Sequence, residues 1–380
     1  MYVLGLMSGT SADGIDAVLA TFTGKPHQPK WDLKNTASIA YPSELRKLII
    51  EAGQGVLLSS QEWLDLGEAI TELHARAVLV CDPDRRAEIV GCHGQTVFHR
   101  PPSFPKRGAS WQLIQAPLLA TIINLPVVFD FRSQDLALDG QGAPLVPLAD
   151  EALVGRISGW RALLNLGGIA NLTLLPPKCG PDKSSSVLGW DCGPANTFID
   201  LAVSQISQGK LDFDRNGEMA SKGSPNLEAI KSWLKEPFFH KRFPKSTGRE
   251  QFGLKDFERR LAELNFPSSN DLVSTMTTFT AEVIANELKN LSNNLNITPV
   301  ELLVSGGGSK NLVLMDQIRI RSKGITVLEL KKIGIHPEFR EALAFALLAW
   351  WHSKGVHGNS PSITGARKSS VLGVKVYPAG

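Results

Sequence analysis

Two glycine-rich turns, each flanked by apolar runs, lie in the two halves of the chain. The first covers residues 7–16, and the second is Gly167-Gly168. Apolar runs on both sides of a glycine turn predict strand, turn, strand. Successive backbone N–H groups in such a turn form a concavity suited to anions, phosphate above all. The pair therefore constrains the chain to a fold in which two hairpins are available to hold one phosphate.

Length and composition favour a two-domain globular protein. The chain has 380 residues, of which 43% are hydrophobic and 20% charged, so each half can build its own core. Lys and Arg number 40 against 37 Asp and Glu, a net charge of +3, which argues against a dedicated nucleic-acid binder. The four cysteines form no C-x-x-C pair, so neither a zinc site nor a disulfide framework is indicated.

Targeting and membrane signals are absent from the pattern. No basic segment precedes the first apolar run, as a signal peptide would require. No apolar run approaches the ~20 residues of a membrane helix, and the longest candidate, Ala342–Trp351, is half that. We expect a cytoplasmic protein with neither nucleic acid nor membrane as a partner.

Both halves mix hairpins with strand–helix units, which predicts a duplicated α/β architecture. Helical spacing marks 62–80 and 337–351, whereas 97–111 is expected to be a loop rich in Pro, Gly and basic residues. Asp271 could cap a further long helix. For the domains we expect a first lobe of residues 1–130, joined by 353–380, and a second lobe of residues 131–352, with the chain crossing near 140–144.

The common nucleotide motifs are missing. The chain contains no P-loop, no Rossmann fingerprint and no G-x-S-x-G elbow. Ser305-Gly306-Gly307-Gly308 stands where a strand meets a helix, and there a purine or ribose could pack against bare backbone. Taken alone, this glycine triplet would indicate only a tight turn between a strand and a helix. Together with the two hairpins it favours a nucleotide site.

Asp191 is the carboxylate best suited to act as a base. It stands at a strand end before Gly193-Pro194, and a rigid turn is a suitable mount for a group that must reach a proton. The alternative interpretation is a helix N-cap or an Asx-turn.

Three further polar side chains have open roles. His93, between Gly91 and Gly94, is either a ligand-contacting or a structural residue. Arg132 either helps to read sugar hydroxyls or forms a salt bridge. Glu341 opens the last apolar helix, where an acidic residue also suits the helix dipole.

Taken together, these segments resemble the anhydro-N-acetylmuramic acid kinase family. The resemblance is carried in order along nearly the full chain by residues 5–16, 93–96, 131–132, 140–145, 165–171, 191–196, 245–250, 305–311 and 341–349. It implies a two-lobed, actin-like (ribonuclease H-like, duplicated) ATPase fold with a nucleotide cleft between the lobes. One departure from the expected pattern is Cys192 beside Asp191.

The resemblance also assigns roles to residues. It implies Asp191 as the catalytic base and makes ATP and Mg²⁺ the cofactors, with Asp13 or Asp16 as the open choice for holding the ion. For the sugar we expect His93, Thr96, Arg132 and Glu341. The residues implied for ATP are Gly9, Thr10, Ser11, Ala12, Asp13, Gly14, Ile15 and Asp16 in the first turn, Gly167 and Gly168 in the second, and Ser305, Gly306, Gly307 and Gly308 at the adenosine.

The implied reaction opens 1,6-anhydro-N-acetylmuramic acid with water and phosphorylates O6. That reaction belongs to the recycling of peptidoglycan, and homodimers are typical of the resemblance. Two alternatives stay open. One is an actin-like nucleotide switch or chaperone ATPase without a small acceptor, and the other is a hexokinase-like kinase of a free sugar hydroxyl.

Overall fold

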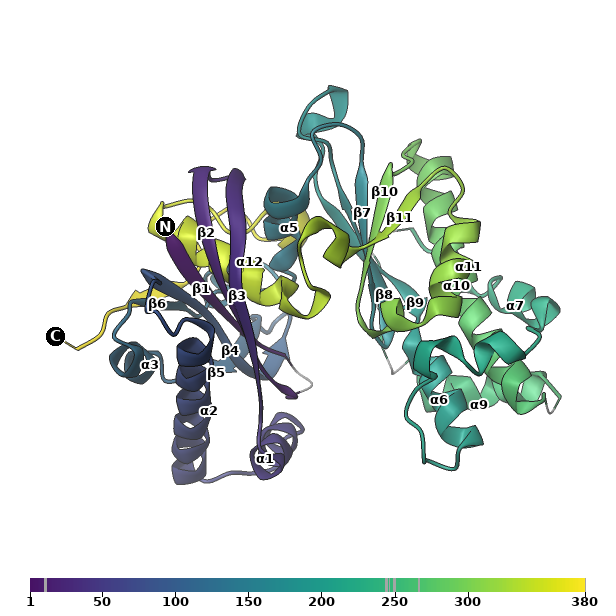
Figure 1. Cartoon of the computed structure of the whole chain (residues 1–380), viewed down its shortest axis with the longest axis horizontal. Coiled ribbons are helices and arrows are strands. Elements are labelled where there is room, and N and C mark those ends of the chain that lie inside the picture. The colour runs from purple at the N-terminus through teal and green to yellow at the C-terminus, as the bar shows by residue number, and fades with distance from the viewer. Residues whose placement is uncertain (10–11, 243–244, 246, 249–250, 266, 380) are drawn as a thin grey trace. The chain divides into compact units, whose positions relative to one another are not determined.

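The computed structural model describes residues 1–9, 12–242, 245, 247–248, 251–265 and 267–379 (Figure 1). The chain divides into two compact units. The first unit joins Met1–Val154 with Gly334–Gly380, and the second is Gly155–Ile333.

The first unit is built on a mixed sheet of order β12-β6-β4-β1-β2-β3, with β5 paired to β4. The β1–β2 and β2–β3 pairs are antiparallel, whereas β4 runs parallel to both β1 and β6. The strands are β1 (Tyr2–Ser8), β2 (Gly14–Lys25), β3 (Gln28–Ala40), β4 (Ile89–Arg100), β5 (Ala109–Leu113), β6 (Val127–Phe129) and β12 (Val374–Val376).

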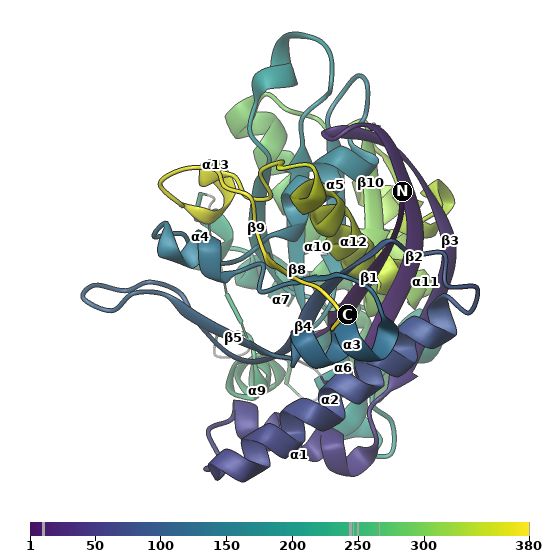
Figure 2. The same ribbon diagram turned by 90° about the vertical axis from the view of Figure 1, so that its left-hand side faces the viewer.

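The helices of the first unit lie around this sheet (Figure 2). They are α1 (Ser43–Gly53), α2 (Ser60–Cys81), α3 (Ala116–Ile123), α4 (Ser133–Ala137), α5 (Val146–Val154), α12 (Arg340–Ser353) and α13 (Pro361–Thr364). Helix α12 lies directly on β1 and β4 because both strands carry glycine where it crosses. A Cβ at Gly5 would overlap the carbonyl oxygen of Ala342, and one at Gly91 that of Phe345.

The division differs from the lobe boundaries expected from the sequence. Residues 131–154 and 334–352 belong to the first unit, where the second lobe was expected. The physical reason is the close packing of α12, whose residues Ala342–Trp351 are all buried. This packing recruits the C-terminal part of the chain from Gly334 onward, and the first crossing falls at Val154 rather than near 140–144.

The second unit repeats the plan with a sheet of order β11-β10-β7-β8-β9. Its strands are β7 (Arg161–Leu166), β8 (Ile169–Leu175), β9 (Leu188–Pro194), β10 (Glu301–Ser305) and β11 (Thr326–Glu329). Its helices are α6 (Asn196–Ile206), α7 (Leu227–Trp233), α8 (Pro237–His240), α9 (Leu254–Glu263), α10 (Ser269–Leu295) and α11 (Leu312–Arg321). The apolar sides of β7, β8, α6 and α10 meet in one core.

Five strands of the first sheet have the same order and pairing as the five strands of the second. In each, a hairpin and a third antiparallel strand are followed by two strands parallel to the first: β3-β2-β1-β4-β6 in one unit and β9-β8-β7-β10-β11 in the other. The two glycine turns occupy equivalent positions, between strands one and two. The expected duplicated α/β architecture is therefore confirmed.

Of three local expectations from the sequence, the structure confirms one and differs from two. The helix expected at 62–80 is confirmed as α2, which begins with a capping box between Ser59 and Glu62. The stretch 97–111 is no simple loop, since β4 continues to Arg100 and pairs with β5 in a hairpin that projects from the first unit (Figure 2). Ser268, not Asp271, caps α10. Among the described helices, none combines the length and apolar character that a membrane span requires.

Candidate active site

In the second unit, the Gly167-Gly168 turn is fixed by the start of α6. The Gly167 carbonyl accepts from the Asn196 N–H at 3.0 Å, and the Gly168 carbonyl accepts from the N–H groups of Ala195 and Thr197 at 2.9 and 3.2 Å. The Thr197 hydroxyl adds a bond of 2.8 Å to the Gly168 carbonyl. These bonds satisfy N–H groups that a helix start leaves without intrahelical partners. The turn is thereby held in one orientation.

The Ser305–Gly308 segment lies beside this turn. Strand β10 runs parallel to β7, so Ser305 pairs with Asn165 at the carboxyl ends of both strands. Gly306 has φ +84, and a Cβ there would lie 2.7 Å from the backbone of Leu166, so the fold itself requires glycine. Asn196 links the parts, because its side chain donates to the Leu166 carbonyl at 2.9 Å.

Gly167 contrasts with Gly306. Its φ is one that other residues adopt, and a Cβ would meet nothing nearer than 3.5 Å. The fold does not need glycine at this position. A glycine that packing does not explain is suited to the close approach of a ligand.

Asp191 lies within β9, which continues to Pro194, rather than at the strand end expected from the sequence. The β8–β9 register pairs Ala170 with Gly193 and Asn171 with Asp191, so Cys192 is the extra residue of a bulge. Bulges re-aim neighbouring side chains and are common next to active sites. The Asp191 carboxylate accepts a hydrogen bond from the Thr247 N–H at 2.9 Å. The turn, Asp191 and the Ser305–Gly308 segment, all singled out in the sequence, thus come together in one unit.

Cys192 is not a reactive group. Its side chain is fully buried, and burial raises the pKa of the thiol well above its usual value, with the nearby Glu287 acting in the same direction. It stays a neutral thiol inside the core and offers no nucleophile.

In the first unit, the first turn is anchored to β4. The buried Ser8 hydroxyl bonds to the Gly14 carbonyl at 3.1 Å, to the Tyr41 hydroxyl at 2.9 Å, and also to the Gln95 side chain. Gln95 in turn donates to the Gly9 carbonyl at 3.0 Å. Both ends of the turn are therefore fixed. Thr10 and Ser11 lie outside the described residues.

The remaining residues of the first turn differ in what they can offer. The side chains of Ala12 and Ile15 are buried in the core, so only their backbone could meet a ligand. The largely exposed Asp13 forms an ion pair with Arg46 at 2.7 Å. Asp16 accepts from the Ser38 hydroxyl at 2.7 Å, and burial, followed by the charge of Glu338, raises the pKa of its carboxyl group.

The buried His93 and the half-buried Arg132 form a cluster on the same unit. Arg132 donates to His93 Nε2 from Nε at 3.2 Å and from Nη2 at 2.9 Å, and to the Gly142 carbonyl at 2.7 Å. Burial and then the charge of Arg132 lower the pKa of His93 to about 3. His93 is therefore neutral at physiological pH.

Glu341, in the first turn of α12, belongs to the same cluster through its charge. Glu341 is itself solvent-exposed, but protein atoms around its carboxylate raise its pKa by desolvation, while the positive charges of Arg340 and Arg132 act against that shift. Arg340 itself pairs with Asp150. Thr96 lies within the β4–β5 hairpin, where its hydroxyl accepts from Gln112 at 3.3 Å. Of the four expected sugar residues, His93 and Arg132 are hydrogen-bonded to each other, and Glu341 is linked to Arg132 only through the effect of charge on its pKa. No described contact joins Thr96 to these three.

Several supporting residues were not identified from the sequence as part of the site. Asn196 and Thr247 bond directly to its elements, and Asp135 supports Arg132 by accepting from the Gly142 N–H at 2.8 Å. Asn196 and Thr247 do fall within the segments that carry the family resemblance. Asp135 lies outside those segments.

The duplicated α/β fold, with a glycine turn at the same place in each unit and a positioned carboxylate beside one of them, defines the class of actin-like ATPases and sugar kinases. Within that class the assignment is specific. The chain belongs to the anhydro-N-acetylmuramic acid kinase family, whose model matches residues 1–379.

Curated relatives share more than half of their residues with the chain. An anhydro-N-acetylmuramic acid kinase of Prochlorococcus marinus (strain MIT 9303) is 60% identical, and one of Synechococcus sp. (strain CC9902) is 58% identical, each with 100% of both chains covered.

Two solved structures align with the chain at low scores. Component A of (R)-2-hydroxyglutaryl-CoA dehydratase from Acidaminococcus fermentans has a TM-score of 0.41 at 12% identity, over 93% of this chain and 99% of that one. A ROK family glucokinase from Streptomyces griseus, in complex with glucose and AMPPNP, has a TM-score of 0.39 at 12% identity, over 92% and 99%. The family assignment rests on the sequence relatives.

Proposed function

We propose that the chain converts 1,6-anhydro-N-acetylmuramic acid, water and ATP into N-acetylmuramic acid 6-phosphate and ADP. The observation that carries this proposal is the Asp191 carboxylate, fixed by the Thr247 N–H beside the Gly167-Gly168 turn. A family of kinases that consumes water needs one group to activate that water. Asp191 is the group we assign to this role.

The proposed chemistry balances in two steps. Asp191 takes a proton from water as the water oxygen bonds to C1 of the sugar and the C1–O6 bond breaks. The departing O6 carries the electron pair of that bond and attacks the γ-phosphorus of ATP, so ADP leaves. Asp191 then releases its proton to solvent.

Phosphoryl transfer itself needs mainly positioning and charge neutralisation. For the phosphates we assign the backbone of Gly9 to Asp16 and that of Gly167 and Gly168, and for the adenosine Ser305 to Gly308. Support comes from the hydrogen bonds that fix both turns and from a glycine at 167 that the fold does not require.

For the sugar we assign His93, Arg132 and Glu341. Arg132 offers a guanidinium suited to the lactyl carboxylate of the muramic acid, and Glu341 can accept hydrogen bonds from hydroxyl or amide groups. Both ring nitrogens of His93 are already bonded, Nε2 to Arg132 and Nδ1 to the Gly94 carbonyl, so His93 would act by orienting the guanidinium. Thr96 is the weaker assignment, because its hydroxyl already bonds to Gln112.

Mg²⁺ would be held by one carboxylate together with the ATP phosphates. The described residues contain no cluster of three or more His, Cys, Asp or Glu side chains fit to cage a metal, and Mg²⁺ bound through substrate phosphates needs none. Of the two candidates we favour Asp16, because Asp13 is paired with Arg46 whereas negative neighbours and burial raise the pKa of Asp16. When bound, the ion would neutralise charge on the phosphates.

ADP release tests the proposed function. The assay supplies Mg-ATP with 1,6-anhydro-N-acetylmuramic acid, N-acetylmuramic acid or N-acetylglucosamine in parallel. We expect release with the anhydro sugar alone. Release without any acceptor would favour a nucleotide switch or chaperone ATPase, and release with a free sugar would favour a hexokinase-like kinase.

We further propose a cytoplasmic homodimer that serves peptidoglycan recycling. The substrate is a fragment of cell-wall breakdown, and its phosphorylation by ATP requires access to the nucleotide pool. Light scattering on the purified protein should give twice the chain mass of 41.2 kDa. A monomer mass at micromolar concentration would contradict the dimer without affecting the proposed reaction.

A further inference from the structure

Residues from outside β9 hold Asp191 at two points. The Asp191 N–H donates to the Lys245 carbonyl at 3.0 Å, and the Thr247 N–H donates to the Asp191 carboxylate at 2.9 Å. Both the backbone and the side chain of Asp191 therefore depend on where Lys245 and Thr247 lie.

The Lys245 side chain extends into the core and meets Glu287 of α10. Its ammonium group lies 2.6 Å from Glu287 Oε1, and the two side chains are only 3% and 4% exposed. Lys245 also donates to the Phe238 carbonyl at 3.3 Å and lies over the Phe238 ring at 4.7 Å. The ammonium group is thus enclosed by partners on several sides.

Glu287 also bonds to β9 itself. Its Oε2 accepts from the Trp190 indole N–H at 2.8 Å, and Trp190 is the residue before Asp191. One buried carboxylate therefore ties together Lys245, which precedes Thr247 by two residues, and the strand residue adjacent to Asp191. Glu287 thus contacts both segments that form the Thr247–Asp191 hydrogen bond: the segment of the donor through Lys245, and the strand of the acceptor through Trp190.

Stability alone does not account for such a pair. Removing two charges from water is costly, and replacing a buried ion pair with apolar side chains is often neutral or stabilising. What a fully bonded buried pair does provide is one defined arrangement of the parts that it joins. The parts joined here are the two that set the direction of the Asp191 carboxylate.

We propose that Lys245 and Glu287 are positioning residues for Asp191, which hold the Thr247 N–H against its carboxylate and so aim it for proton abstraction. This inference rests on the proposed role of Asp191. Because a small misplacement of a reacting group costs rate more than binding, loss of the pair should lower kcat and leave the KM values of both substrates unchanged.

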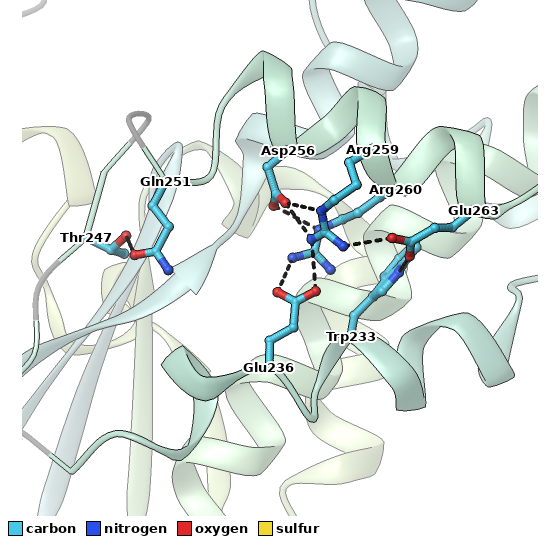
Figure 3. Close-up of polar contacts among 8 residues, drawn as sticks. All are labelled: Trp233, Glu236, Thr247, Gln251, Asp256, Arg259, Arg260 and Glu263. Atoms are coloured by element: carbon cyan, nitrogen blue, oxygen red, sulfur yellow. Dashed lines mark hydrogen bonds and ion pairs between the residues drawn. The ribbon is translucent and has the colours of Figure 1, made fainter.

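A second buried cation in the same unit provides a matched control. Arg260 is fully buried, pairs with Glu236 at 2.7 Å and Asp256 at 2.9 Å, and lies over three aromatic rings, those of Phe198, Trp233 and Phe279. Figure 3 shows Arg260 with Glu236, Asp256 and Trp233, together with the separate contact between Thr247 and Gln251. Arg260 resembles Lys245 in burial and surroundings, but its ion pairs lead to Glu236 and Asp256 rather than to β9.

The experiment compares Lys245→Met, Glu287→Gln, their double variant and Arg260→Met, all assayed below their melting temperatures. We expect kcat to fall about 10- to 100-fold in the first three, with both KM values within about twofold of the wild type. The double variant should be no slower than the worse single variant, since the two residues act as one unit. The kcat of Arg260→Met should stay within about twofold of the wild type even if its melting temperature falls.

Hydrogen exchange of the β9 peptide, Leu188–Pro194, adds a readout independent of activity. Protection of the Asp191 amide should fall in Lys245→Met and Glu287→Gln but not in Arg260→Met. The inference is overturned if the Lys245 and Glu287 variants keep the wild-type kcat, whether or not their KM values rise. It is also overturned if they match Arg260→Met in both kcat and hydrogen exchange. If the wild type fails to release ADP with the anhydro sugar, the proposed function fails, whereas the exchange result still tests the contact.

Discussion

Arg132 donates two hydrogen bonds to a single atom, Nε2 of His93, at 3.2 and 2.9 Å. A guanidinium can only donate, so Nε2 must be the unprotonated nitrogen of the ring. The proton then resides on Nδ1, 2.8 Å from the Gly94 carbonyl. The geometry thus assigns one neutral tautomer to His93 and leaves Arg132 as the positive charge of the pair, near enough to Glu341 to act on its pKa.

Loss of this charge should weaken sugar binding. In Arg132→Met we expect the KM for the anhydro sugar to rise about tenfold or more, because a charge-assisted hydrogen bond contributes about 1.5–3 kcal/mol, while the KM for ATP stays unchanged. Steady-state kinetics with each substrate varied in turn measures both. Arg367→Ala, which removes an exposed arginine paired with Asp139, is the control and should leave both values unaltered. A rise in the ATP KM alone would contradict the assignment of Arg132 to the sugar.

Buried histidines should make the protein sensitive to acid. Burial lowers the pKa of His74 to about 4, and burial with the charge of Arg132 lowers that of His93 to about 3, from an ordinary 6.5. Between these values the unfolded chain binds more protons than the folded one, so the free energy of unfolding falls as the pH drops below about 6.5. By pH 4 the His74 contribution to the loss is about 3 kcal/mol.

Chemical denaturation between pH 7 and pH 4 measures this loss. In His74→Leu the fall should be shallower by about the His74 contribution, whereas His357→Gln, which replaces an exposed histidine, should follow the wild type. Parallel curves for the wild type and His74→Leu would show that His74 titrates normally.

Two glycines that follow neighbouring parallel strands, Gly167 after β7 and Gly306 after β10, should respond differently to alanine. Gly306→Ala should lower the free energy of unfolding by about 1–3 kcal/mol, since its φ is +84 and the new Cβ would lie 2.7 Å from Leu166. Gly167→Ala should fold as the wild type does, because its Cβ would have at least 3.5 Å of space. If Gly167 approaches the phosphates, that same variant should raise the KM for ATP. Wild-type ATP kinetics in Gly167→Ala would remove the turn from the nucleotide site.

Asp191→Asn should separate chemistry from binding. We expect kcat to fall about 100- to 10,000-fold, the usual contribution of a general base, with little change in the affinity for ATP. Rapid-quench kinetics measures the turnover rate, and calorimetric titration with a non-hydrolysable ATP analogue measures the nucleotide affinity. Substantial turnover in Asp191→Asn would show that another group activates the water.

The sequence predicts features made of neighbouring residues and misses contacts between residues that are far apart in the chain. Both hairpins and the Ser305–Gly308 turn are readable because glycine and apolar runs lie next to each other in the chain. The pairing of His93 with Arg132 joins residues 39 positions apart, and that of Lys245 with Glu287 joins residues 42 apart. No local pattern encodes these contacts, since they arise only when β4 pairs with β6 and when α10 packs on the second sheet.

The domain division shows the same limit. Helix α12 is recognisable from its apolar residues, but its partner sheet is not, because an apolar helix fits either core. The deciding signal is the pair Gly5 and Gly91, whose missing side chains admit the helix backbone. Each glycine alone reads as an ordinary strand residue, and their joint meaning depends on the parallel pairing of β1 with β4.

The origin of the oxygen at C1 decides whether an activated water opens the anhydro ring. The reaction is run with Mg-ATP and the anhydro sugar in water enriched in oxygen-18, and the product is examined by mass spectrometry before the anomeric oxygen exchanges with solvent. We expect one labelled oxygen at C1 and an unlabelled phosphate ester at O6. An unlabelled C1, or label in the phosphoryl group, would contradict ring opening by an activated water coupled to phosphorylation of O6.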